Sequence, residues 1–239
     1  MMIQDQPDPY IVPHCDKEIE ILYEDEHLLI INKPDGLLSV PGRHPLNRDS
    51  IHSRLLASYP EMGMAHRLDL DTSGLMIIPL NKTILAAVNR MFQERQINKS
   101  YTAILGGLLA TDSGKVDLPL IFDWPNRPLQ KVCQSSGKGA LTYYKVLSRD
   151  TVAKTTTVLF TPITGRSHQL RIHSRELGHP IIGCDMYATR EIYEQGDRLM
   201  LHATQLSFIH PYTQEPLVIC SSPSFGEDLC DQLEPLSCG

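Results

Sequence analysis

The nine residues His66 to Gly74, with the sequence HRLDLDTSG, place a basic side chain, a carboxylate and turn-forming residues between two apolar segments. Apolar residues recur at helical spacing upstream, within 49–59, and the apolar run 75–78 downstream is typical of a strand. Catalytic carboxylates often lie where regular structure ends. However, Asp, Thr, Ser and Gly are also the residues of an ordinary turn. Spacing alone therefore favours a turn over an active-site loop.

The pattern His-Arg-Leu-Asp-x-x-Thr-Ser-Gly resembles the signature of the RluA family of pseudouridine synthases, whose members isomerise selected uridines in structured RNA. Further segments resemble the family, in the family's own order, from about residue 20 to residue 225: 30–37, 99–101, 162–173, 178–184 and 201–203. Within the family, three segments are most similar to the branch that modifies both large-subunit ribosomal RNA and tRNA: 38–43, 117–128 and 130–133. The implied partners are a 23S rRNA stem-loop and the tRNA anticodon stem-loop.

The implied reaction breaks the N1–C1′ bond of uridine, turns the uracil and rejoins it through C5, so it needs no cofactor. It does need an ionised carboxylate near C1′, a group that moves a proton and a pocket that retains the freed base. Glycosidases use a carboxylate similarly at an electron-poor anomeric carbon. The resemblance makes Asp69 the nucleophile, whereas Asp71 falls at a variable position of the pattern.

Two more residues complete the implied catalytic group, and each has a plainer alternative. The resemblance makes Arg171 the cation that keeps Asp69 ionised, although an arginine in a helix is commonly a surface charge. It makes Tyr101 the aromatic side chain that stacks on the target uracil and handles a proton. A tyrosine in a strand is also a common core residue.

The remaining expected site residues bind RNA or uracil. A uridine in folded RNA is stacked, so the enzyme must flip it out, and Arg67 is the candidate to fill the vacated space. Residues i and i+2 of an extended segment share one side, which places Arg67 beside Asp69. We group His66 with Arg67 as an RNA-binding residue.

Helix geometry separates the two arginines of segment 162–173. Five residues of an α-helix place Arg166 about 140° from Arg171, so Arg166 is expected to contact RNA phosphate or to serve a structural role. Ile172 and Leu201 are expected to form apolar walls around the base, unless they are simply core residues.

The composition limits how the chain could hold RNA. Its 239 residues carry a formal charge of −6, which argues against binding through a strong overall positive field. Basic residues instead gather in two stretches, around the motif and after it: Arg43, Arg48, Arg54 and Arg67, then Arg127, Lys131, Lys138, Arg166, Arg171 and Arg175. Those outside the motifs could equally be solvated surface charges.

The sequence shows no membrane span, signal peptide, paired cysteines or zinc motif, and these absences guide the expected compartment and metal content. No apolar run approaches the ~20 residues of a membrane span and the N-terminus does not resemble a signal peptide, so we expect a cytoplasmic protein without membrane contact. Six scattered cysteines, with no Cys-x-x-Cys pair, are expected to be reduced. The spacing of His168, His173 and His179 fits no zinc motif, so no metal site is expected.

The chain divides into a flexible arm (1–17), a catalytic domain (18–225) and a disordered acidic tail (226–239). Periodicity predicts strands at 20–23, 28–32, 75–78, 100–105, 140–147, 155–161 and 199–208, and helices at 82–94 and 167–177. This pattern favours an α+β fold. The resemblance implies the same class: a long, curved, mixed and mostly antiparallel sheet with flanking helices and a central cleft. A monomer is the default expectation.

Three alternatives stay open. The enzyme could act on rRNA only, or the fold could serve as a noncatalytic RNA-binding or RNA-folding module. A carboxylate-dependent hydrolase would need a second acid, and only Asp71 lies nearby. The sequence also leaves open whether Asp69 attacks C1′ or promotes an elimination across the sugar.

Overall fold

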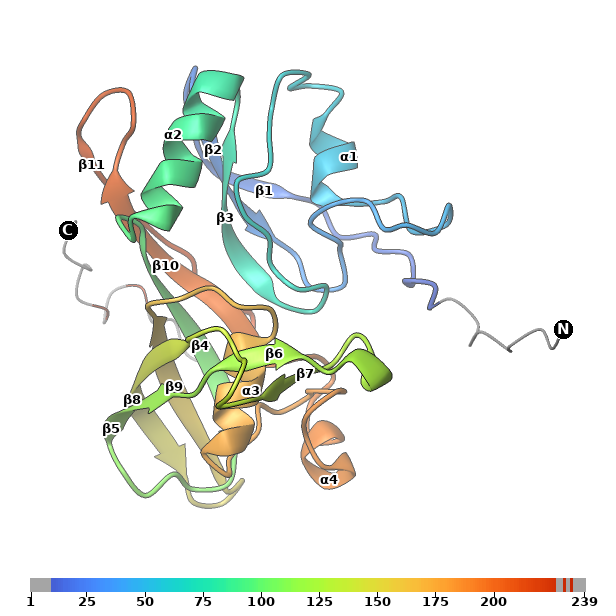
Figure 1. Cartoon of the computed structure of the whole chain (residues 1–239), viewed down its shortest axis with the longest axis vertical. Helices are drawn as coiled ribbons and strands as arrows, with labels where there is room; N and C mark the ends of the chain where they lie inside the picture. Colours follow the sequence, from blue (N-terminus) through green and yellow to red (C-terminus); the bar gives the residue numbers. More distant parts are fainter. Residues whose placement is uncertain (1–9, 227–229, 231–232, 234–239) are drawn as a thin grey trace, which may run out of the picture.

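The computed structural model describes residues 10–226, 230 and 233, and it is built on one long mixed sheet (Figure 1). The strands follow the order β1-β2-β3-β10-β4-β9-β8-β5, and β11 pairs with β10. In this sheet β3 and β10 run parallel and the other pairs run antiparallel. The predicted α+β class, with a mixed and mostly antiparallel sheet, is therefore confirmed.

The strands of the long sheet are β1 Glu20–Glu24, β2 Leu28–Lys33, β3 Ser73–Pro79, β4 Asn98–Gly106, β5 Ser113–Asp117, β8 Leu141–Asp150, β9 Thr155–Pro162, β10 Leu201–Ile209 and β11 Pro216–Cys220. A separate hairpin consists of β6 Leu120–Phe122 and β7 Gln130–Val132, joined through the 3-10 turn η1 Trp124–Asn126. The helices are α1 Ile51–Leu55, α2 Lys82–Gln93, α3 Gln169–Glu176 and α4 Arg190–Tyr193.

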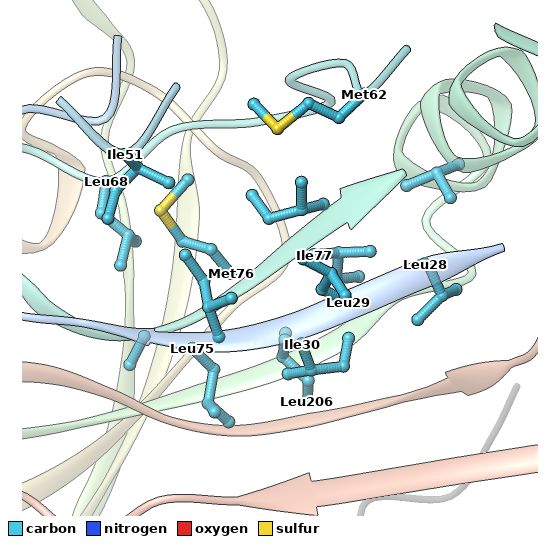
Figure 2. Close-up of a cluster of buried hydrophobic side chains, with 14 of the residues drawn as sticks. Leu28, Leu29, Ile30, Ile51, Met62, Leu68, Leu75, Met76, Ile77 and Leu206 are labelled. Carbon is cyan, nitrogen blue, oxygen red and sulfur yellow. The ribbon is translucent and has the colours of Figure 1, made fainter. Parts of the chain in front are cut away.

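Two hydrophobic clusters divide the molecule into halves. The buried residues of the first come mainly from β2, β3, α1, α2 and β10, and those of the second mainly from β4, β8, β9, α3 and the start of β10. Figure 2 shows the first cluster, in which Met76 of β3 points to one side of the sheet and Leu75 to the other. Figure 1 shows β4 and β10 passing between the two halves. Tyr101 on β4 packs against both clusters, so it marks the boundary between them.

Local sequence explains where the helices begin and end. Asn81 caps α2 by accepting a hydrogen bond from the Ile84 N–H, and the apolar stripe of α2 packs on β3. Helix α3 is shorter than the predicted 167–177, because His168 adopts a left-handed conformation (φ +56°) that a helix cannot contain. Most predicted strands are confirmed and extend a few residues further in the structure.

Several short elements were not predicted, namely β5, β6, β7, β11 and α4. Each has five residues or fewer, and β5 has the sequence SGKVD, in which only Val116 is a buried apolar residue. The backbone groups of the four strands among them pair with neighbouring strands, although their own residues show no clear alternation. Tertiary pairing rather than intrinsic propensity determines these strands.

The expectation that all six cysteines are reduced is wrong for two of them. Cys220, at the end of β11, forms a disulfide with Cys230, with a Cα–Cα distance of 5.7 Å. Among the described residues Cys15, Cys133 and Cys184 are free thiols, and Cys238 lies outside them.

The predicted arm and tail lie largely outside the described residues. In the part of the arm that the structure describes, Val12 N–H donates to Asn47 Oδ1 (2.9 Å), Lys17 pairs with Asp35 (2.8 Å) and Cys15 is buried. No helix in the described part of the chain is long and apolar enough to cross a membrane.

Candidate active site

A cavity of about 560 Å³ lies between the two halves and receives side chains from both. Of the predicted site residues, all but one line it: His66, Arg67, Asp69, Tyr101, Arg166, Arg171 and Leu201. They come from the loop before β3, from β4, from the segment that begins α3 and from the start of β10. The structure thus brings together residues that are up to 135 positions apart in the sequence, between His66 and Leu201.

Ile172 is the predicted wall residue that the structure places elsewhere. It is fully buried in the second cluster and does not belong to the cavity lining, whereas Leu170 does. Leu170 and Ile172 are two positions apart in the helix and therefore point about 200° away from each other, so only one of them can face the cavity. Leu170 and Leu201 therefore form the apolar wall.

A buried lysine binds the backbone of the loop that carries Asp69. Lys33, at the end of β2, has no exposed surface, and its Nζ donates to the carbonyl oxygens of Pro34 (2.8 Å), Leu37 (2.6 Å) and Leu70 (2.9 Å). Ser39 Oγ donates to Leu68 O (2.8 Å) and accepts from Leu68 N–H (3.1 Å). Both backbone neighbours of Asp69 are thus fixed to the segment that follows β2.

Burial lowers the pKa of Lys33 from 10.5 to about 7, against the opposing effect of Asp71, Asp35 and Asp69. Between these two values the unfolded chain holds a proton that the folded protein does not, so stability rises with pH by up to about 1.4 kcal/mol per pH unit. Lys33→Met removes this dependence. We therefore expect the unfolding free energy of wild type, relative to that of Lys33→Met, to rise from pH 7 to pH 9 in urea titrations.

The matched control for this prediction is Lys82→Met, at the exposed start of α2. Its difference from wild type should stay constant over the same pH range. A constant difference for Lys33→Met as well would show that Lys33 keeps its proton in the folded protein.

Arg171 is buried, with 2% of its surface exposed, so it is not a surface charge. Its Nη2 donates to Asp185 Oδ1 in an ion pair, and its Nε contacts Cys184 Sγ at 3.2 Å. Burial acts to lower the pKa of Arg171, but Cys184, Asp185 and Asp69 together raise it. Asp69 is therefore within electrostatic reach of Arg171, while the direct ion pair is with Asp185, a residue that sequence reasoning missed.

Tyr101 lies beside this charged group. Burial, and then the charge of Asp69, raise the pKa of Tyr101 above its usual value. Its phenol is therefore protonated at neutral pH, next to a cavity that also holds the carboxylate.

A second network connects the end of the Asp69 loop to β10. Ser73 Oγ accepts from Arg198 Nη2 (2.6 Å) and contacts His202 Nδ1 (2.7 Å), and Arg198 pairs with Asp35 (2.8 Å). Burial lowers the pKa of His202 to about 4, so its ring is neutral. Arg198 and Asp35 lie 163 residues apart, and no sequence signal indicated that they meet.

The predicted RNA-binding residues divide into two kinds. His66 is used within the protein: its Nε2 accepts from Ile77 N–H (2.9 Å), and its ring lies 4.8 Å from that of Phe92. Burial, assisted by Lys99, lowers the pKa of His66 to about 3, so the ring is neutral and holds the loop against β3. Arg67 and Arg166 are exposed at the cavity, and Arg166 Nε donates to Gly139 O (3.1 Å).

The cavity has a charge opposite to that of the whole chain. Its lining in the described part of the chain holds one carboxylate, Asp69, among several cationic side chains: Arg67, Arg95, Lys99, Arg166 and Arg171. A cleft lined mainly by side chains of one charge has an electrostatic potential of that sign, whatever the net charge of the protein. A polyanion is therefore attracted to the site that holds Asp69.

The histidines considered as metal ligands have other partners. His173 Nδ1 contacts Thr142 Oγ1 (2.9 Å), and His179 Nδ1 donates to Gly106 O (2.8 Å). His168 Nδ1 contacts Tyr187 Oη (2.6 Å).

A carboxylate, a protonated tyrosine and a buried arginine, gathered in a cationic cavity at the centre of a mixed sheet, define an RNA-modifying isomerase of the pseudouridine synthase class. The family model described as RNA pseudouridylate synthase matches residues 27–176, and the chain belongs to this family.

Among curated relatives, the "Dual-specificity RNA pseudouridine synthase RluA" of Vibrio vulnificus is 50% identical over 84% of this chain and 81% of its own length. The protein of the same name from Escherichia coli is 48% identical over 80% of this chain and 87% of its own. Among solved structures, Human RNA Pseudouridylate Synthase Domain Containing 1 superimposes with a TM-score of 0.73 at 28% identity, covering 94% of this chain and 91% of that one.

Proposed function

We propose that this enzyme isomerises specific uridines to pseudouridine in stem-loops of both 23S rRNA and the tRNA anticodon arm, with Asp69 as nucleophile and without a cofactor. The observation that carries the proposal is the position of Asp69 in a cavity that otherwise presents cations. The curated names of the relatives described above support the choice of two RNA classes. We also propose that it works as a monomer in the cytoplasm.

In the proposed reaction, an Asp69 oxygen forms a bond to C1′ while the N1–C1′ bond breaks, and the uracil leaves with that electron pair. Tyr101 and the wall residues Leu170 and Leu201 hold the freed base in the cavity. After the base turns, C5 bonds to C1′ while the bond from C1′ to Asp69 breaks, which restores the carboxylate. The proton on C5 is then lost and N1 takes up a proton, so the product is an isomer of the starting uridine. Arg171, paired with Asp185, keeps positive charge near Asp69 throughout.

Chemical mapping of pseudouridine tests this proposal. Unmodified 23S rRNA and tRNA transcripts are incubated with the enzyme and then mapped by pseudouridine-specific labelling. New sites in both RNA classes are the expected result. Sites in rRNA alone would restrict the enzyme to one class, and RNA binding without any new site would favour a noncatalytic RNA-binding module.

Arg67 provides a test of base flipping. Its exposed side chain borders the cavity two residues before Asp69, and we propose that it fills the stack that the target uridine vacates. We expect Arg67→Ala to reduce the rate about tenfold more on a structured stem-loop than on a flexible single strand that contains the same target. This difference corresponds to roughly 1.4 kcal/mol of unstacking energy that Arg67 no longer offsets.

The control for this test is Arg90→Ala, which removes an arginine of α2 outside the cavity lining. It should affect both substrates equally and slightly. Equal losses on both substrates for Arg67→Ala would exclude Arg67 from the flipping step.

A further inference from the structure

His168 occupies a conformation that residues with a Cβ adopt rarely. It lines the cavity directly before α3, with φ +56° and ψ 17°. Such a left-handed backbone is unfavourable outside glycine, and it persists where the surrounding structure enforces it, commonly at functional sites. His168 therefore combines a constrained backbone with a place in the lining of the cavity.

A chain of hydrogen bonds fixes which nitrogen of His168 carries the proton. Gln130 N–H, on β7, donates to Tyr187 Oη at 2.9 Å, and Tyr187 Oη lies 2.6 Å from His168 Nδ1. Tyr187 is 6% exposed, and within the described part of the chain its hydroxyl has only these two partners. Its hydroxyl proton must therefore point at His168 Nδ1, because any other direction leaves a buried O–H without an acceptor.

The electrostatics keep both rings neutral. Burial raises the pKa of Tyr187, so the hydroxyl keeps its proton. Burial also lowers the pKa of His168; Asp69 and Asp185 oppose this effect, while Arg171 and Arg67 reinforce it. A neutral imidazole that accepts at Nδ1 carries its one proton on Nε2.

The ring of Tyr187 is itself held in place. The guanidinium carbons of Arg171 and Arg175 lie 5.4 Å and 5.5 Å from its ring centre. His168 Nε2, at the other side of the imidazole, has no partner within the residues that the structure describes. Because His168 lines the cavity that contains Asp69, this N–H is available to a ligand in the cavity.

We propose that His168 Nε2–H donates a hydrogen bond to a carbonyl oxygen of the target uracil and stabilises the negative charge that develops there when the N1–C1′ bond breaks. This inference rests on the proposed function, since it requires a uracil in the cavity. A preorganised donor placed where charge develops accelerates the step in which that charge forms. A neutral imidazole suits the task, because an imidazolium would pair with Asp69 instead.

Two substitutions separate the donor from the fold. Asn tolerates the left-handed conformation, and its amide oxygen can accept from Tyr187 Oη in place of Nδ1, so His168→Asn removes only the N–H that reaches the cavity. His168→Gln has an amide N–H at a position close to that of Nε2. We expect single-turnover rates at saturating enzyme to fall about 10²-fold in His168→Asn and to recover about tenfold in His168→Gln, with RNA Kd within about threefold of wild type for both.

The tautomer is measured separately, by ¹⁵N–¹H NMR of the imidazole nitrogens. We expect a protonated Nε2 and an acceptor Nδ1 in wild type, and a mixture of tautomers in Tyr187→Phe, with a rate between those of wild type and His168→Asn. An unchanged rate in His168→Asn, a loss confined to Kd, or a protonated Nδ1 would overturn the inference. If wild type makes no pseudouridine, the proposed function fails and this inference fails with it.

Discussion

Asp69→Asn is expected to lower the single-turnover rate of pseudouridine formation by at least about 10³-fold, because an amide cannot act as the nucleophile at C1′. RNA affinity should stay equal or increase, since the substitution removes the one negative charge among the cationic residues of the described cavity lining. The two quantities are measured on one stem-loop, by single-turnover assay and by fluorescence anisotropy at fixed salt.

Asp71→Asn is the matched control for Asp69→Asn. Asp71 lies two residues further along the same loop and is absent from the cavity lining, and burial raises the pKa of its carboxyl. Its replacement should lower the rate by about tenfold or less, roughly 1.4 kcal/mol. Comparable losses in the two variants would mean that general loop integrity, rather than the Asp69 carboxylate, limits the reaction.

Gly74→Ala is expected to destabilise the fold by about 3–5 kcal/mol, through backbone strain and overpacking together. Gly74 has φ +110°, and a Cβ at this position would lie 2.3 Å from Ala203 O and 2.5 Å from Ala203 N. These are backbone atoms of β10 in the parallel pairing of β3 with β10, so they cannot move aside cheaply. The measurement is the unfolding free energy from urea titration, followed by circular dichroism.

Gly139→Ala serves as the control for Gly74→Ala, because a Cβ added to Gly139 would meet no atom within 4 Å and this glycine does not have a positive φ. The substitution should change stability by about 0.5 kcal/mol or less. A stable Gly74→Ala protein would mean that β3 and β10 can separate locally without loss of the fold.

The elements with strong periodicity were predictable from the sequence, and α2 is the clearest case. Its apolar residues Ile84, Val88 and Met91 repeat at helical spacing, and Asn81 precedes them as a cap. By contrast, β5 and the β6–β7 hairpin consist of residues without alternation and exist because a neighbouring strand supplies their hydrogen bonds. Such pairing is a property of the folded chain, which no local window contains.

For the candidate site, motif resemblance indicated which residues meet but not how they are held. Asp69, Tyr101 and Arg171 do converge on one cavity. The ion pair between Arg171 and Asp185 and the contact of Arg198 with Ser73 join distant segments, and no spacing rule relates them. His66 was predicted to bind RNA, and in the structure its Nε2 accepts a hydrogen bond from the backbone N–H of Ile77.

The parallel pairing of β3 with β10 has a consequence for biosynthesis. The loop that carries Asp69 emerges from the ribosome early, but its partner strand begins at Leu201, well over a hundred residues later. At about 5–20 residues per second, the nascent chain exposes one edge of β3 for several seconds before β10 is made. Such an apolar, unpaired edge invites association with other chains. Slow translation would therefore prolong the exposure of this edge, and premature termination before Leu201 would release aggregation-prone fragments. Catalytic competence would arise only near the end of synthesis.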